Sequence, residues 1–441
     1  MNFAGKTARF LAYFFAFFLP WQTRLILFPG SLNNGVWEYG TVSLYATEIV
    51  LWLAIICAII TRVHECKVQS VKCKVAVKGL KFWGAMAAVG VIVFSIVRSG
   101  SPELGWYWVL HAIEAVGIFW LVRQNFVRLK PMIIALLCGA VLQLALAFWQ
   151  FSAQEVFASK WLGMAAQDSS VSGVSVVEND QGRFLRAYGS LPHPNILGGY
   201  LAIAIVIAIA SCKRLDGVTK SWVRFVFPAT LCFLVSGLVL SFSRSAWIAL
   251  FLGSIIWLFL IWKKPTNKDR RNSLRIFYIL HATFYILILI LWPLSSTRIF
   301  GEGRLERFSI EERSGKLSEV VKIIGRHPLF GVGPGNYTLA VYRELDNTRP
   351  GATYQPVHNV FLLALAELGI LGFVALGFLE ALLTKGWRFL KKSEAFAVMA
   401  ILLALMLFDH FLWSLPFGLW LSGFALGFAS LMGDDIIEPI V

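Results

Sequence analysis

Residues 245–262 read SAWIALFLGSIIWLFLIW, an apolar run of 18 residues without a charged side chain. Arg244 precedes this run, and Lys263 and Lys264 follow it. A helix rises about 1.5 Å per residue and the hydrocarbon core of a bilayer is about 30 Å thick, so a run of this length predicts a membrane-spanning helix. The run therefore indicates an integral membrane protein.

The rest of the chain has the same character. Its 441 residues are 58% hydrophobic and 15% charged, with a mean hydropathy of +0.69. A soluble domain carries about 25% charged residues, so this composition excludes a disordered chain, a coiled coil and an ordinary cytosolic enzyme. We predict an all-α polytopic membrane protein in which residues 1–441 form one integral membrane domain. It has about 12 transmembrane helices, near 8–28, 41–61, 82–98, 104–122, 131–151, 195–211, 225–241, 245–262, 275–295, 357–380, 394–412 and 414–432.

The distribution of lysine and arginine predicts the orientation. The loops 62–81 and 263–275 hold six basic residues each, whereas the loops 29–40, 99–103 and 413–416 are nearly neutral. Basic loops face the cytoplasm, so we expect both termini there as well. On this topology 25 of the 40 basic residues are cytoplasmic. The net charge of +15 therefore reflects membrane orientation, and we expect no nucleic-acid partner.

Two long segments lie on the outside in this topology, at 152–194 and at 296–356 between the ninth and tenth spans. Long ordered loops in a compact protein are usually functional. The second loop is predicted to contain short helices. One of them is an amphipathic helix whose face toward the membrane core comprises Leu317, Val320, Val321 and Ile324, as their helical spacing indicates.

Several arginines lie on the outer side. Arg244 occupies a tight connection, Ser-Phe-Ser-Arg-Ser, between two apolar spans. It is either an interfacial arginine that reaches into water or a fixed cation that points into a cavity. Arg313 lies in a charged run that also suits a solvated helix face, and Arg307 is one of its neighbours. Planar guanidinium groups match phosphate oxygens, so these arginines could bind a phosphate-rich ligand.

Histidines and carboxylates gather on the same side. His358 and Asn359 open the tenth span, and Asp409 and His410 lie near the outer end of the eleventh. A histidine is suited to act as the general base for a hydroxyl, although a structural polar cap is equally compatible with this position. An ionisable pair at such a depth is a candidate functional site or a mutual structural pair.

Two further segments approach this outer face. Arg186, His193 and Asn195 precede or begin the sixth span, and Pro194 predicts that this helix starts after His193. The segment GVGPGNY, which ends in Asn336 and Tyr337, is either a turn or a backbone nest for an anion. The outer face has no HExxH, CxxC or acidic cluster, so we predict no metal site.

These segments together resemble the O-antigen ligase family. The resemblance is carried by His358-Asn359 with Gly369 and Gly372, by Ser243-Arg244-Ser245-Ala246-Trp247, by His327–Tyr337, by Arg313 with Leu317, and by Pro192–Asn195. The detailed similarity covers about 186–372, and the layout of twelve spans covers the whole chain.

The resemblance implies a GT-C-like membrane glycosyltransferase of lipopolysaccharide biosynthesis in the bacterial inner membrane. It implies a glycan donor linked to undecaprenyl pyrophosphate, an acceptor hydroxyl of the lipid A-core type on a lipid or glycan, no cofactor, and a site that faces the periplasm. Arg244 and Arg313 would neutralise the pyrophosphate and His358 would be the base. Arg186, His193, Asn195, Arg307, Asn336, Tyr337, Asn359, Asp409 and His410 would bind substrate.

Two other functions remain compatible with the sequence. A polysaccharide polymerase of the same superfamily would use the same carrier but would pass the glycan to another carrier-linked repeat. A transporter or flippase would instead use charged residues near the midplane, for which Glu48, His111, Glu114 and Glu367 are candidates.

Overall fold

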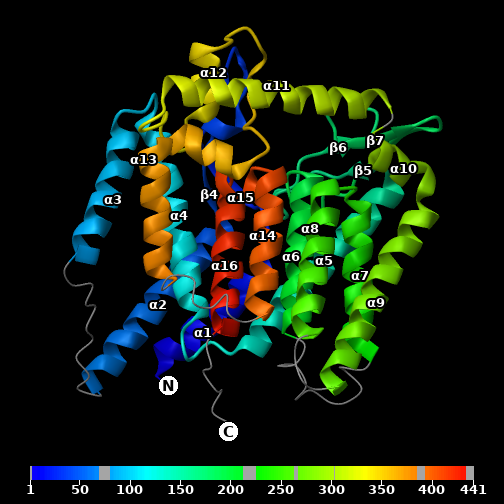
Figure 1. The fold of residues 1–441 in the computed structure, drawn as a ribbon, viewed down its shortest axis with the longest axis horizontal. Helices are drawn as coiled ribbons and strands as arrows, with labels where there is room; N and C mark the ends of the chain where they lie inside the picture. Colours follow the sequence, from blue (N-terminus) through cyan, green and yellow to red (C-terminus); the bar gives the residue numbers. More distant parts are fainter. Residues whose placement is uncertain are drawn as a thin grey trace.

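The computed structural model of the protein describes residues 2–68, 80–211, 225–262, 267–301, 303–384 and 393–433. Its helices run side by side, and most of the connecting structure gathers at one end of the bundle (Figure 1). The bundle comprises α1 (Phe3–Phe18), α2 (Ala46–Val68), α3 (Leu80–Val97), α4 (Pro102–Val122), α5 (Leu129–Ala153), α6 (Pro194–Ala210), α7 (Phe227–Leu240), α8 (Arg244–Trp262), α9 (Asn267–Ile290), α13 (Val360–Leu383), α14 (Ser393–Phe408) and α16 (Pro416–Gly433).

We call the end that carries the connecting structure the loop face. Further helices lie there: α10 (Trp292–Phe300), α11 (Arg304–Arg326), α12 (Tyr337–Glu344) and α15 (Phe411–Ser414). Small antiparallel hairpins complete it, pairing β1 (Arg24–Phe28) with β4 (Val42–Tyr45), β2 (Ser31–Leu32) with β3 (Gly35–Val36), β5 (Glu155–Val156) with β6 (Gln167–Asp168), and β7 (Val176–Asn179) with β8 (Gly182–Leu185). The segment 296–356 contains helices as predicted, but α11, with 23 residues, is longer than expected.

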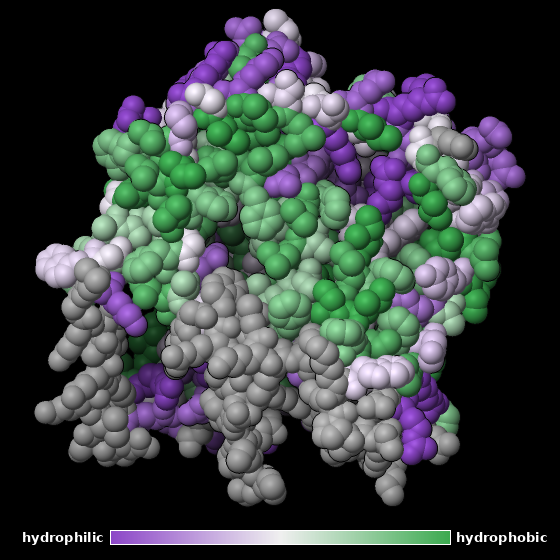
Figure 2. Space-filling model, viewed as in Figure 1, coloured by the Kyte–Doolittle hydropathy of each residue, from purple (hydrophilic) through white to green (hydrophobic). Residues whose placement is uncertain are grey.

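Among the described residues, five helices are long and apolar enough to cross a membrane, and six apolar helices are shorter. The five are α2, α4, α5, α9 and α13. A belt of hydrophobic side chains covers the visible side of the bundle, and the loop face is more hydrophilic (Figure 2). Trp83, Ile113, Phe233 and Leu289 are each at least half exposed, which is typical of a lipid-facing surface. The protein is thus an α-helical membrane protein, while twelve spans remain a prediction.

The first predicted span, 8–28, is wrong in its second half. The helix α1 ends at Phe18, and Arg24–Phe28 forms strand β1, which pairs with β4. Proline cannot continue a helix, because it lacks the amide proton and its ring clashes with the preceding turn. Pro20 therefore ends the helix early, and the apolar residues that follow adopt an extended conformation.

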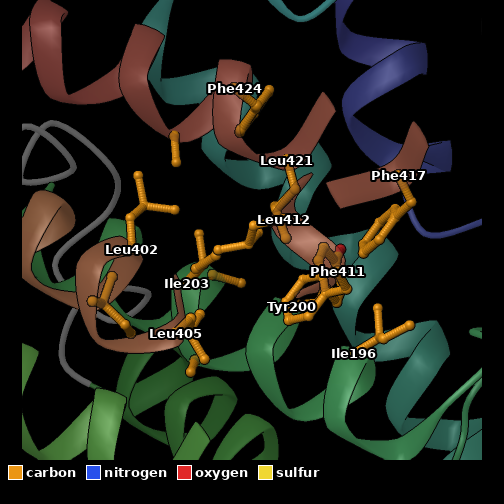
Figure 3. Close-up of a cluster of buried hydrophobic side chains, with 14 of the residues drawn as sticks. Ile196, Tyr200, Ile203, Leu402, Leu405, Phe411, Leu412, Phe417, Leu421 and Phe424 are labelled. Carbon is orange, nitrogen blue, oxygen red and sulfur yellow. The ribbon is translucent and has the colours of Figure 1, made fainter. Parts of the chain in front are cut away.

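Helix α6 lies at the centre of the core, since all of its residues are buried. Figure 3 shows Ile203 of this helix beside Leu402 and Leu405 of α14, with Tyr200 beside Phe411 and Ile196 on the side of Phe417. A Cβ at Gly199 would lie 2.7 Å from the Phe411 ring, so glycine allows this close packing. The packing fixes the first turn of α6 against the connection between α14 and α15.

Helix α13 is broken at Gly369, which has φ 63° and ψ −178°. Its first part lies below α11 and its second part runs down beside α3 (Figure 1). A Cβ at Gly369 would lie 2.4 Å from backbone atoms of Leu329 and Phe330. A segment of the loop therefore packs against this glycine, and only the second part of the predicted span 357–380 is oriented to cross a membrane.

Helix α11 lies flat across the loop face (Figure 1). Its buried residues are Glu306, Lys316, Val320 and Ile323. The predicted apolar face is therefore partly wrong, because Leu317 is 46% and Val321 is 64% exposed. The helix directs charged side chains inward, which apolar periodicity alone does not reveal.

Candidate active site

Asp409 lies at the centre of a group of polar side chains on the loop face. It follows α14, which ends at Phe408. Its Oδ1 lies 3.7 Å from Nδ1 of His358 and accepts a hydrogen bond of 2.8 Å from the backbone N–H of His410. Its Oδ2 accepts a hydrogen bond of 3.1 Å from the side chain of Asn195. Three chain segments that are distant in sequence therefore meet at one carboxylate.

His358 is positioned by the start of α13. Asn359 caps this helix, with Oδ1 accepting from the backbone N–H of Leu362 at 3.0 Å, and its Nδ2 donates to the carbonyl of Leu407 at 3.1 Å. The separation of 3.7 Å from Asp409 is longer than a hydrogen bond. Among the described residues, the buried Nδ1 of His358 has no hydrogen-bond partner, so this imidazole faces a carboxylate without being locked to it.

Arg186 and Asn195 form a chain of hydrogen bonds that ends at Asp409. The guanidinium of Arg186 donates to Oδ1 of Asn195 at 2.6 Å and to the carbonyl of Ser241 at 2.9 Å. Because the oxygen of the Asn195 amide is engaged in this way, its nitrogen is directed to Asp409. Burial lowers the pKa of Arg186 from its ordinary value. The two residues thus fix the position of the carboxylate.

Two histidines of this group are held neutral. His193 is the N-cap of α6, and its Nδ1 accepts from the backbone N–H of Asn195 at 3.1 Å. Its Nε2 therefore carries the proton and donates to Oγ of Ser175 at 3.0 Å. Burial and the charge of Arg186 lower the pKa of His193 to about 3. Burial also lowers the pKa of His410 to about 3, so neither is suited to accept a proton at neutral pH.

Asp409 itself stays ionised. Burial raises the pKa of its carboxyl, but the neighbouring His358 lowers it further, to below its ordinary value. The ligand atoms of His358, Asp409 and His410 lie within 4.8 Å of one another, so their geometry could hold a cation. The positive charge of Arg313 acts on the same carboxylate and disfavours a second cation there.

A second group links Arg244 to two other helices. Nη2 of Arg244 lies 3.0 Å from Oε2 of Glu306, and Nη1 donates to the carbonyl of Arg298 at 3.2 Å. Glu306 also pairs with Arg298, whose Nε donates to the carbonyl of Phe242 at 3.2 Å. Phe242 has φ 46°, a left-handed conformation that costs an L residue about 1–2 kcal/mol. These contacts therefore hold a strained turn directly before Arg244.

Arg313 lies within electrostatic range of both groups. It interacts with Asp409, Arg244 and Glu306 through its charge. Burial lowers the pKa of Arg313, and Asp409 opposes this effect, but a guanidinium remains protonated in proteins. In the described part of the chain, no hydrogen bond or ion pair engages its side chain. Arg313 is thus a half-buried cation without a fixed partner.

The charges of the two groups do not balance. Four guanidinium groups, from Arg186, Arg244, Arg298 and Arg313, face the two carboxylates of Glu306 and Asp409. Uncompensated cations at a partly buried site are costly unless an anion binds there. The arrangement is therefore suited to a ligand with several negative charges.

The structure brings Arg244, Arg313, Arg186, Asn195 and the predicted histidines to this region, but not every predicted residue. Arg307 is exposed on α11. The amide of Asn336 is occupied by the backbone of Ser101, at 2.8 and 3.0 Å. Tyr337 is buried at the start of α12. Among the described residues, no hydrogen bond joins any of these three to Asp409, and their binding roles remain predictions.

The segment GVGPGNY is occupied by the protein's own carboxylate. Glu367 accepts from the backbone N–H of Tyr337 at 3.4 Å and from the indole N–H of Trp413 at 2.7 Å. The backbone N–H of Gly335 also donates to it. The turn interpretation of this segment is correct, and a nest for an external anion is not available at these N–H groups.

Glu306 is the residue that sequence reasoning missed. It belongs to a charged run in which composition alone does not select one residue. Its spacing of seven residues from Arg313 places both side chains on one face of α11. This spacing is the sequence feature that could have identified Glu306. The sequence does not distinguish Arg298 from the other arginines nearby, because its contact with Glu306 depends on the packing of α10 against α11.

Comparison with known proteins gave one family. The model of the O-antigen ligase family matches residues 228–377, a segment that contains Arg244, Arg298, Glu306, Arg313 and His358. Asp409 and Asn195 lie outside it. A search of curated proteins found no match.

Proposed function

Because the chain belongs to the O-antigen ligase family, we propose that it transfers a glycan from undecaprenyl pyrophosphate to a hydroxyl of an acceptor of the lipid A-core type. The loop face would be the periplasmic face of the bacterial inner membrane. The observation that carries the proposal is the excess of guanidinium groups beside the His358–Asp409 pair. An anionic leaving group and a hydroxyl nucleophile need these two kinds of group next to each other.

The arginines would neutralise the leaving group. When the bond between the anomeric carbon and the pyrophosphate oxygen breaks, negative charge develops on that oxygen. Arg313 has no fixed partner and is free to bind the pyrophosphate, while Glu306 orients Arg244 toward it. Removal of one such donor typically raises the barrier by about 3–4 kcal/mol. This charge stabilisation suits a reaction without a metal ion or another cofactor.

His358 would accept the proton of the acceptor hydroxyl. As the hydroxyl oxygen forms its bond to the anomeric carbon, the proton moves to the imidazole, which becomes positively charged. The Asp409 carboxylate 3.7 Å away stabilises this charge, and Asn195 and Arg186 keep the carboxylate in place. The proton then leaves to water. General base catalysis is typically worth about 10²–10⁴-fold.

The displacement inverts the anomeric configuration, because the hydroxyl attacks from the side opposite the leaving pyrophosphate. A retaining reaction would need a carboxylate nucleophile on the sugar. Asp409 is held by Asn195 and by the His410 backbone, which favours a supporting role for it. The stereochemistry of the product tests this point directly.

A reconstituted transfer assay tests the function. Purified protein in liposomes is mixed with a glycan on undecaprenyl pyrophosphate and with lipid A-core, and the glycosylated acceptor is measured. We expect product with the wild type, a loss of at least about 10²-fold for His358→Ala, and no loss for His64→Ala, which alters an exposed histidine on α2. Full activity of His358→Ala would exclude it as the base.

The same assay separates the alternatives. A polymerase lengthens the carrier-linked glycan when lipid A-core is omitted, whereas a ligase gives no product under that condition. A transporter or flippase moves the donor across the bilayer without forming a new glycosidic bond. Absence of any new glycosidic bond with both acceptors would therefore overturn the proposed function.

A further inference from the structure

A separate cavity on the loop face lies where the end of α3 meets α11 and α12. It has a volume of about 400 Å³ and is lined by Arg98, Arg326, Arg343, His327 and Glu344, with Pro328–Val332 as part of its wall. None of these residues belongs to the Asp409 group or to the Arg244 group. We call it the Arg98 cavity.

The Arg98 cavity has an excess of positive charge. Glu344 is the one acidic residue in its lining, and it is shared by Arg326 at 3.4 Å and by Nε2 of His327 at 2.9 Å. Arg343 donates to the carbonyl of Gly100 at 3.0 Å. Three guanidinium groups thus face one carboxylate, and an anion would complete the charge balance. Guanidinium forks match phosphate oxygens in geometry as well as in charge.

The cavity lies directly above an apolar surface. Arg98 follows the end of α3, and its guanidinium lies 5.5 Å from the centre of the Phe94 ring. Along α3, Trp83 is 70%, Met86 54% and Val97 63% exposed, as expected of a helix in contact with lipid. A molecule with an anionic group and an attached hydrocarbon chain fits this combination of a basic cavity and an apolar helix face.

Arg98 is also unusual for its place in the predicted topology. It lies at the connection 99–103, which is short and otherwise free of basic residues. Short connections on the outer side of a membrane protein carry few lysines and arginines. A local anionic ligand supplies a reason for an arginine at this position.

The cavity is physically joined to the candidate active site through α13. The backbone N–H groups of Ile370 and Leu371 donate to the carbonyls of Pro328 and Leu329 at 2.8 and 3.1 Å. The first part of α13 leads from this point toward His358, which precedes Ile370 by about twelve residues, or about 18 Å at a helical rise of about 1.5 Å. A ligand with its anionic group in the cavity could extend an attached sugar chain over this distance.

We propose that the Arg98 cavity is the site that binds a phosphate group of the membrane-anchored acceptor. The inference rests on the proposed function, because it places the acceptor hydroxyl at His358. Basic sites between membrane helices bind lipid phosphate groups through the same interactions. An acceptor without a phosphate, such as a protein, does not use this site.

A binding experiment tests the cavity without relying on activity. The purified full-length protein in detergent is titrated by calorimetry with dioctanoyl phosphatidate, dioctanoyl phosphatidylcholine and inorganic phosphate. We expect saturable binding of phosphatidate that is tighter than that of the other two. Each of Arg98→Ala and Arg343→Ala should weaken it by about fivefold, on the basis of about 1 kcal/mol per cationic side chain.

Two control variants separate electrostatics from loss of structure. Arg304→Ala removes an exposed arginine of the same face that pairs with Glu178, and it should leave binding unchanged. Glu344→Gln removes the one carboxylate of the lining, and it should tighten binding rather than weaken it. Equal binding by the wild type and the Arg98→Ala and Arg343→Ala variants, or equal affinity for inorganic phosphate and phosphatidate, overturns the proposal.

Kinetics then connect the cavity to the acceptor. In the transfer assay, Arg98→Ala should raise KM for lipid A-core by about fivefold and leave kcat and KM for the donor unchanged. A rise in the donor KM instead, or no change in either KM, contradicts an acceptor site. If the protein forms no glycosidic bond at all, the proposed function fails, whereas the calorimetric result still decides whether the cavity binds lipid phosphate.

Discussion

Replacement of Asp409 by asparagine tests the central pair of the candidate active site. The substitution keeps the shape of the side chain, but its single amide oxygen can accept only one of the two hydrogen bonds that come from Asn195 and from the His410 backbone. It removes the negative charge that faces Nδ1 of His358 at 3.7 Å. The variant therefore keeps the shape of the side chain but loses one hydrogen bond and the charge that stabilises the protonated imidazole.

The expected loss of activity follows from the distance between His358 and Asp409. Two unit charges 3.7 Å apart interact with about 4.5 kcal/mol at an effective dielectric constant of about 20. A loss of this size from the transition state corresponds to about 10³-fold in kcat. Removal of the carboxylate that supports a catalytic histidine has an effect of about 10⁴-fold in serine proteases, so the expected range is consistent with known cases.

The assay is turnover of the lipid-linked donor in liposomes at saturating acceptor. We expect kcat of Asp409→Asn to fall about 10³-fold while the donor KM changes little, because the leaving group is bound by arginines. Asp180→Asn, an exposed residue of the same face, is the matched control and should retain full activity. A kcat of Asp409→Asn within about tenfold of the wild type would refute the electrostatic support of His358 by Asp409.

Three further predictions concern the arginines, the helix break and the response to pH. Arg244→Lys should lower kcat at least about 10²-fold in the same assay, because a point charge cannot reproduce the two-pronged contact of a guanidinium; near-normal turnover would contradict direct binding of the leaving group. Gly369→Ala should lower the melting temperature of the purified protein, because its Cβ would lie 2.4 Å from the Leu329 backbone at a positive φ, whereas Gly377→Ala meets nothing within 4 Å and should not lower it. In the folded protein the pKa of His410 is lowered to about 3, whereas in the unfolded chain a histidine has a pKa of about 6.5. Below pH 6.5 the unfolded chain therefore binds a proton that the folded protein does not, and the free energy of unfolding falls by about 1.4 kcal/mol per pH unit. His410→Gln should flatten the fall of melting temperature between pH 6.5 and 4, and an unchanged slope would show that this histidine is not held neutral.

Much of this architecture was predictable because the bilayer restricts what a chain can do. Long apolar runs such as 245–262 have to form helices, since no other local structure satisfies the backbone in hydrocarbon. Each of the twelve predicted segments overlaps a helix of the structure. His193 before Pro194 was expected to precede the sixth helix, and it is the N-cap of α6. Local rules of helix length, proline and capping were sufficient for these features.

Other features depended on contacts between distant segments. The break of α13 at Gly369 arises because residues 328–330 pack against it, so the apolar run 357–380 alone did not predict it. Glu306 became important only because α10 and α8 place Arg298 and Arg244 on either side of its carboxylate. These ion pairs of Glu306 also determine which side of α11 faces inward.

The amino-acid sequence by itself determined that this chain is a helical membrane protein, which arginines and histidines are candidates for a site, and which family it resembles. Those properties follow from local composition and short motifs. Only the tertiary structure decided which arginine is free, which histidine faces a carboxylate, and that the glycine-rich turn holds Glu367. The physical reason is that charge interactions weaken with distance and are screened by salt over about 8–10 Å, so the function of an ionisable group depends on neighbours that are close in space but distant in sequence.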